Sequence, residues 1–138
     1  MTTHLLTFRF GGDTTYEGQH LGALERIEAA GRLRVLDALI VLKERGGELA
    51  AIRARDSADV VSSMVSARLD PGARRRQTER ALRGDLAEVI QRVGDALEPG
   101  GAWAVLLADT TAEAIETLGA TSAPVQARRL GEVAGRLA

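Results

Sequence analysis

The residue best placed to do chemistry in this chain is an aspartate inside an apolar run. Asp37 follows Leu36 and precedes five apolar residues, at positions 38–42. A buried carboxylate that lacks a cationic partner or hydrogen bonds is strongly destabilising. The position of Asp37 therefore predicts either a structural ion pair or a functional acid.

Three arginines flank this aspartate in the predicted hairpin. Arg34 lies on the same segment as Asp37, whereas Arg53 and Arg55 lie on the returning segment. Because structural ion-pair networks commonly involve such carboxylates, we interpret Asp37 as the partner of one of these arginines. The alternative is a ligand- or proton-binding role for Asp37, with Arg53 and Arg55 beside it.

A run of arginines forms the second candidate site, a surface for anions or for a partner. If the segment is a helix, three of its arginines share one face and could contact phosphates. However, Glu79, Asp85 and Glu88 are interspersed, and the net charge of the chain is −1. We therefore interpret the run as a solvated face with local ion pairs and expect no nucleic-acid binding. Its members are Arg74, Arg75, Arg76, Arg80 and Arg83.

Other catalytic and cofactor motifs are missing from the sequence. The chain has no cysteine, so disulfides, thiolate metal sites and cysteine nucleophiles are excluded. His4 and His20 are its two histidines, and neither has a second ligand at helical spacing. The glycine pairs lack the spacing of phosphate-binding loops and are better read as turns. We expect no metal, no cofactor and no catalytic residue.

The elements that must position these residues alternate between strand and helix. Residues 4–10 alternate as a strand, and a helix follows, from a capping box at Thr14 and Glu17 to a stop at Gly31. Residues 33–55 predict a β-hairpin that turns at Gly46-Gly47. The turn has either two residues, in a type I′ conformation, or three, from Arg45 to Gly47, and a one-residue slip inverts every side chain.

The second half of the chain predicts further helices around one apolar strand. A short helix begins at Asp56 and ends before Asp70-Pro71-Gly72, and a second apolar stripe runs from Leu82 to Leu97. Residues 102–108 are apolar on both faces, so we expect this strand at the centre of its sheet. A helix around Ile115, an edge strand at residues 124–130 and a terminal helical turn that frays complete the chain.

These elements predict one α+β domain over residues 1–138. Their order predicts a ferredoxin-like split β-α-β fold. We expect an antiparallel or mixed sheet with helices mainly on one face, and a C-terminal α-β-α extension. If helices cover one face only, the first hairpin strand leaves a bare apolar patch, which monomers rarely tolerate. We therefore expect a homodimer or larger assembly through a face formed by Leu36, Ala38, Leu39, Ile40, Val41 and Leu42.

Two segments resemble a family of uncharacterised actinobacterial proteins that is defined only as a domain of unknown function. One is the glycine-terminated helix and aspartate-containing strand at residues 29–43, and the other is Ala96-Leu97-Glu98-Pro99-Gly100-Gly101 with the strand after it. The resemblance covers most of the chain but not the arginine run at residues 74–83. General-stress-protein-like relatives also carry a glycine-rich insert that is missing here. The resemblance implies a bacterial protein of this fold and implies no activity.

The sequence as a whole predicts a non-catalytic, self-associating structural or regulatory module. The alternative is a small-molecule-binding or enzymatic domain of the dimeric ferredoxin-like barrel type. The N-terminus lacks the basic start of a signal peptide, and no apolar run is long enough to span a membrane. We therefore expect a cytoplasmic protein without a membrane span, and a protein partner besides its own copies is an open alternative.

Overall fold

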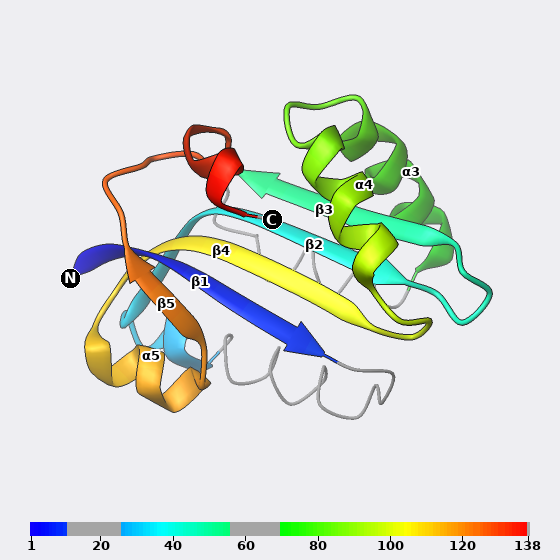
Figure 1. Cartoon of the computed structure of the whole chain (residues 1–138). Helices are drawn as coiled ribbons and strands as arrows, with labels where there is room; N and C mark the ends of the chain where they lie inside the picture. Colours follow the sequence, from blue (N-terminus) through cyan, green and yellow to red (C-terminus); the bar gives the residue numbers. More distant parts are fainter. Residues whose placement is uncertain (11–25, 56–69, 138) are drawn as a thin grey trace.

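A computed structural model describes residues 1–10, 26–55 and 70–137 of the chain (Figure 1). They form an α+β structure around one five-stranded antiparallel sheet, with the strand order β3-β2-β4-β1-β5. The prediction of an α+β fold with an antiparallel sheet is thus confirmed. The strands are β1 (Thr2–Phe10), β2 (Leu33–Lys43), β3 (Leu49–Arg55), β4 (Ala102–Thr110) and β5 (Thr121–Pro124).

The central strand of the sheet is β4, which pairs with β1 on one side and β2 on the other. Its residues 102–108 are all buried, as the apolar pattern on both of its faces predicted. Thr110, at the end of β4, is also fully buried, and its hydroxyl donates to the carbonyl of Arg32 at 2.9 Å.

The helices are α3 (Pro71–Leu82), α4 (Ala87–Ala96) and α5 (Ala112–Leu118), and a 3-10 helix, η1 (Leu130–Arg136), lies near the C-terminus. Asp70 and Pro71 begin α3: the Asp70 carboxylate accepts from the Gly72 and Ala73 amides at 2.9 and 3.3 Å. This arrangement satisfies free amides of the first turn and uses proline where it is tolerated. The stripe expected from Leu82 to Leu97 is interrupted around Gly84, where the chain turns from α3 into α4.

The strand order differs from that of a ferredoxin-like sheet, in which the third strand lies between the first two. Here β4 lies between β1 and β2, and β3 lies at the edge beside β2. In this order β1 and β2 enclose β4, and β3 and β4 enclose β2. The predicted ferredoxin-like topology is therefore not confirmed, because the order of elements along the chain does not determine which strands pair.

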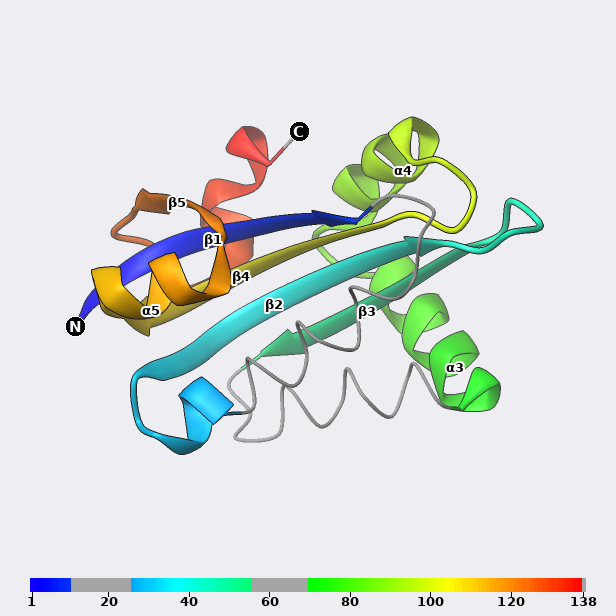
Figure 2. The ribbon, with the colours of Figure 1, turned by 90° about the horizontal axis from the view of Figure 1, so that it is seen from below.

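Both faces of the sheet carry packed layers, although most of the described helices lie on one of the two faces. One face packs against α3, α4 and η1, whose buried residues include Ile90 and Leu130. The other face packs against Ile115 and Leu118 of α5 and against Ile27. Figures 1 and 2 show α5 on the side of the sheet opposite α3 and α4.

The residues expected to form an open oligomer face are therefore not exposed. Ala38, Leu39, Ile40 and Val41 are buried within one chain, and Leu36 and Leu42 are partly buried against the two cores. The prediction that these six residues present a bare apolar surface is wrong. It failed because the 3-10 helix η1, together with α3 and α4, covers the second face.

The hairpin has the three-residue turn, one of the two possibilities in the sequence. Lys43 pairs with Leu49, and the Glu44 amide donates to the Glu48 carbonyl at 2.8 Å. Gly47 adopts φ 89°, a left-handed conformation that glycine tolerates best. In this register Ile52 and Ala54 face the core beside α5, and Asp37 lies opposite Arg55.

The C-terminal segment differs most from its prediction. The last strand comprises residues 121–124 instead of 124–130, and it pairs with β1 as a short edge strand. The terminal segment is a 3-10 helix in which Leu130 and Val133 are buried, and Leu137 directly after it is buried as well, so these residues do not lie frayed at the surface.

Only the end of the predicted first helix falls within the described residues. Residues 26–29 are helical, and Gly31 follows them with φ 75°, which is typical of a glycine that ends a helix. The predicted start of this helix and the predicted helix at residues 56–69 lie outside the described residues.

Candidate functional site

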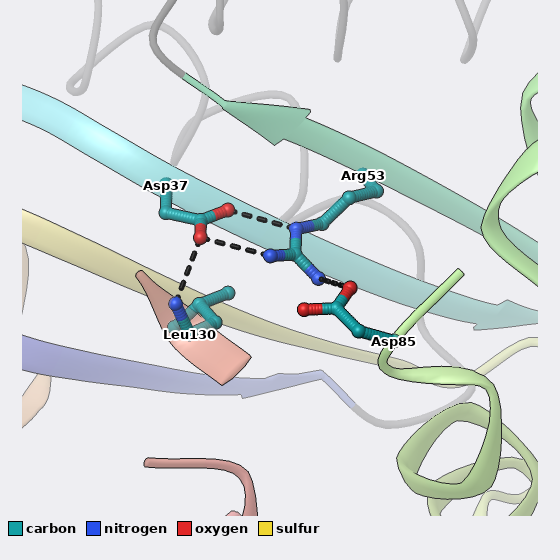
Figure 3. A network of polar contacts seen from close by, with 4 residues as sticks. All are labelled: Asp37, Arg53, Asp85 and Leu130. Atoms are coloured by element: carbon teal, nitrogen blue, oxygen red, sulfur yellow. Dashed lines mark hydrogen bonds and ion pairs between the residues drawn. The ribbon is translucent and has the colours of Figure 1, made fainter. Parts of the chain in front are cut away.

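An ion-pair network joins β2 and β3 of the sheet to the α3–α4 turn and to η1 (Figure 3). The Nε and Nη2 atoms of Arg53 donate to Oδ1 and Oδ2 of Asp37 at 2.8 and 2.9 Å. The Nη1 atom of Arg53 donates to Oδ1 of Asp85 at 3.1 Å, and the Leu130 amide donates to Oδ2 of Asp37 at 2.8 Å. We call these contacts the Asp37 network.

A β-bulge places Asp37 on the face of the sheet that carries α3, α4 and η1. The pairing of β2 with β4 shifts register between Val35 and Asp37, so Leu36 is the additional residue. Val35 and Ala38 then both face the core beside α5, and Asp37 points to the opposite face. Arg53 lies on that same face, because it pairs with Leu39 in the hairpin register.

The hydrogen bonds of Asp37 use both of its carboxylate oxygens. The side chain is 1% exposed and accepts two bonds from Arg53 and one from the main chain of η1. A bidentate guanidinium–carboxylate pair is among the strongest polar contacts in proteins, and it fixes the orientation of both groups. In this arrangement the Asp37 carboxylate accepts all three of these hydrogen bonds from groups of the same chain.

The charges of the network do not cancel. Asp37 and Asp85 contribute two negative charges and Arg53 one positive charge, so the three side chains together carry −1. The Arg53 side chain is 10% exposed, whereas the Asp85 side chain is 48% exposed. The uncompensated negative charge therefore lies at the solvent side of the network, on Asp85.

A pocket of about 340 Å³ opens beside the network, between β3 and the turn that joins α3 to α4. Its volume lies near the lower end of the range for small-molecule sites. Its wall includes Arg53 and Asp85 of the network. The rest of the wall is formed by Leu39, Ala54, Gln77, Arg80, Ala81, Gly84, Leu86 and Ile90.

The structure brings together part of the first predicted site. Asp37 and Arg53 pair directly, as the ion-pair interpretation expected, whereas Arg34 is exposed. Arg55 lies opposite Asp37 in the strand register, but its side chain lies outside the described part of the structure. Sequence reasoning missed Asp85 and Leu130, because a turn carboxylate and a backbone amide show no pattern that links them to a distant strand.

The predicted arginine surface divides into a paired residue and an exposed group. Arg74 forms an ion pair with Glu44 at 3.1 Å, which fastens α3 to the hairpin turn. Arg75, Arg76, Arg80 and Arg83 are exposed, and Arg83 donates to the Glu79 carbonyl at 3.2 Å. Arg80 alone among them also lines the 340 Å³ pocket.

The described residues contain no group of three or more histidine, cysteine or acidic side chains that could hold a metal ion. His4 contacts the Thr2 hydroxyl at 2.7 Å through its Nε2 atom, and His20 lies outside the described residues. In the same described part of the chain, no helix is long and apolar enough to cross a membrane.

Comparisons with known proteins identify no relative. No family model, no curated protein and no solved structure matches the chain. Membership of the actinobacterial family that two segments resemble therefore stays a prediction.

Proposed function

We propose that this protein is a non-catalytic structural or regulatory module of the bacterial cytoplasm. The observation that carries the proposal concerns Asp37, the residue best placed for chemistry, whose carboxylate is already hydrogen-bonded within the chain. Its carboxylate is buried and accepts three hydrogen bonds from the protein itself. A general acid or base must instead come within hydrogen-bonding distance of a substrate atom.

Carboxylate labelling tests this proposal. The folded protein is treated with a water-soluble carbodiimide and an amine, and modified residues are identified by mass spectrometry. We expect Asp37 to stay unmodified under conditions that label the exposed Glu88 and Asp95, and all three to react once urea unfolds the chain. Modification of Asp37 in the folded protein would show that a reagent, and hence a substrate, can reach it.

The expected self-association stays a prediction, but it requires a surface other than the sheet. Among the described residues the large hydrophobic side chain that is exposed is Met1, at 69%. The edge of β3 is covered by α3, where Thr78 accepts from the Ala51 amide at 2.9 Å. The edge strand β5 is short and ends in Pro124, which disfavours pairing with another strand. Light scattering at micromolar concentration measures the oligomeric state directly.

The second candidate is a small-molecule-binding domain, and the 340 Å³ pocket favours it. This candidate differs from the dimeric barrel that the sequence suggested. Such a barrel encloses its ligand between two open sheet faces, and here both faces of the sheet are packed against the chain's own helices. The ligand would instead bind between β3 and the α3–α4 turn.

A further inference from the structure

The pocket beside the Asp37 network combines an apolar floor with a charged wall. Leu39, Leu86 and Ile90 line it and are themselves at most 1% exposed, so the floor is firmly packed. Gln77 and Arg80 on α3 and Asp85 after it contribute polar groups to the same wall. A ligand that fits this pocket needs a short apolar part and a polar end.

Arg53 also lines the pocket, but its guanidinium donors already bind carboxylates of the chain. Its Nε and Nη2 atoms form the bidentate pair with Asp37, and its Nη1 atom contacts Asp85. Arg80 is exposed and takes part in no ion pair with any residue of the described segments. Arg80 is therefore the cation that can meet an anionic group in this pocket.

Asp85 provides the opposite charge on the same wall. Only its Oδ1 atom contacts Arg53, and the side chain is 48% exposed. Because the network carries −1 in total, this carboxylate can accept a hydrogen bond from a cation without leaving Arg53 uncompensated. Asp85 and Arg80 thus line one small pocket with opposite charges that do not pair with each other in the described structure.

We propose that this pocket binds a small zwitterion, with an ammonium and a carboxylate a few bonds apart and a short aliphatic side chain. The carboxylate contacts Arg80 and the amide of Gln77, and the ammonium contacts Asp85. The aliphatic side chain packs on Leu39, Leu86 and Ile90. A purely anionic or cationic ligand would satisfy one of the two charges and face repulsion from the other. This inference rests on the second candidate function, ligand binding without turnover.

Isothermal titration of the full chain with three matched probes tests the proposal. Leucine carries both charges, N-acetyl-leucine lacks the ammonium, and leucinamide lacks the carboxylate, while all three share one side chain. We expect leucine to bind and each analogue to bind at least about tenfold more weakly, because each loses a charged hydrogen bond. The two analogues also mimic the C-terminal and N-terminal residues of a peptide. An analogue that binds as tightly as leucine would overturn the proposal in favour of a chain terminus.

Two substitutions assign the charges to their residues. Arg80→Gln should weaken leucine binding at least about tenfold and remove the preference for leucine over leucinamide. Asp85→Asn should weaken it similarly and remove the preference over N-acetyl-leucine. Arg76→Gln, on the same helix, exposed and outside the wall of this pocket, is the matched control and should bind leucine as the parent does.

Two further results would overturn the inference: no binding of leucine by the parent, or equal affinity in the parent and in Arg80→Gln. Because Arg80 is exposed, its variant should fold even if loss of the Asp85 contact destabilises Asp85→Asn. Incubation of leucine with the protein, followed by its recovery, tests the non-catalytic proposal independently of binding. We expect leucine to be recovered unchanged. Binding with turnover would refute the non-catalytic proposal, and failure to bind would leave the structural role of Asp37 intact.

Discussion

Replacement of Asp37 by asparagine should destabilise the protein by about 3 kcal/mol. The carboxylate accepts three hydrogen bonds, and two of them come from a guanidinium that is itself largely buried. Asparagine keeps one acceptor oxygen and turns an amide N–H₂ group toward donors, so the bidentate pair is lost. The magnitude is placed at the lower end of the range for breaking a buried ion pair, because Asp85 still compensates Arg53.

Urea unfolding followed by Trp103 fluorescence measures this loss. Trp103 is the single tryptophan of the chain and is 2% exposed, so unfolding changes its environment. A lower midpoint with an unchanged slope reports a change in the free energy of unfolding alone. Asp95→Asn, the same substitution at an exposed site of α4, should change stability by less than about 0.5 kcal/mol. A variant at position 37 as stable as the parent, or more stable, would refute a structural role and favour an acid retained for function.

Three further predictions concern the contacts around the sheet and the arginine surface. Gly94→Ala should destabilise the protein by about 1–3 kcal/mol in urea unfolding, because its new Cβ would lie 2.5 Å from Cδ1 of Leu49. The same change in a Leu49→Ala background should be harmless. An equal loss of stability in that background would contradict the steric explanation. Thr78→Val should lose about 1–2 kcal/mol, since the hydroxyl accepts from the Ala51 amide and donates to the Arg74 carbonyl at 2.7 Å; no loss would show that α3 holds the β3 edge by apolar contacts alone. Band-shift titration should find no duplex DNA binding tighter than roughly 10⁻⁵ M at physiological salt, the non-specific range, whereas a tighter, salt-sensitive shift abolished by Arg75→Glu, Arg76→Glu and Arg80→Glu would establish a nucleic-acid surface.

Strands β1 to β4 and the central position of β4 were predictable because their patterns are local, whereas β5 was predicted at other residues. An apolar run on both faces predicted the position of β4, and the glycine pair located the hairpin turn within one residue. The register of that turn was not decidable, because both turn lengths suit Gly46-Gly47. The bidentate ion pair between Asp37 and Arg53 depends on this register and on the β-bulge at Leu36. No residue type at these positions predicts that bulge.

The cover of the second sheet face could not be predicted, since it depends on long-range packing. Leu130 and Val133 of η1, and Leu137 after it, pack into the same core as α4. A 3-10 helix has no strong sequence signature, and its first amide is satisfied by a carboxylate 93 residues away. That contact is also why the Asp37 network spans three distant segments.

The hydrogen bond from the Leu130 amide to Asp37 offers the most direct test of whether the Asp37 network holds η1 on the sheet. Amide hydrogen exchange followed by NMR measures the protection of this proton in the parent and in Asp37→Asn, with the Ile90 amide of α4 as internal reference. We predict slow exchange at Leu130 in the parent and much faster exchange in the variant, with protection at Ile90 changed far less. Fast exchange at Leu130 in the parent, or equal protection in both proteins, would contradict the account.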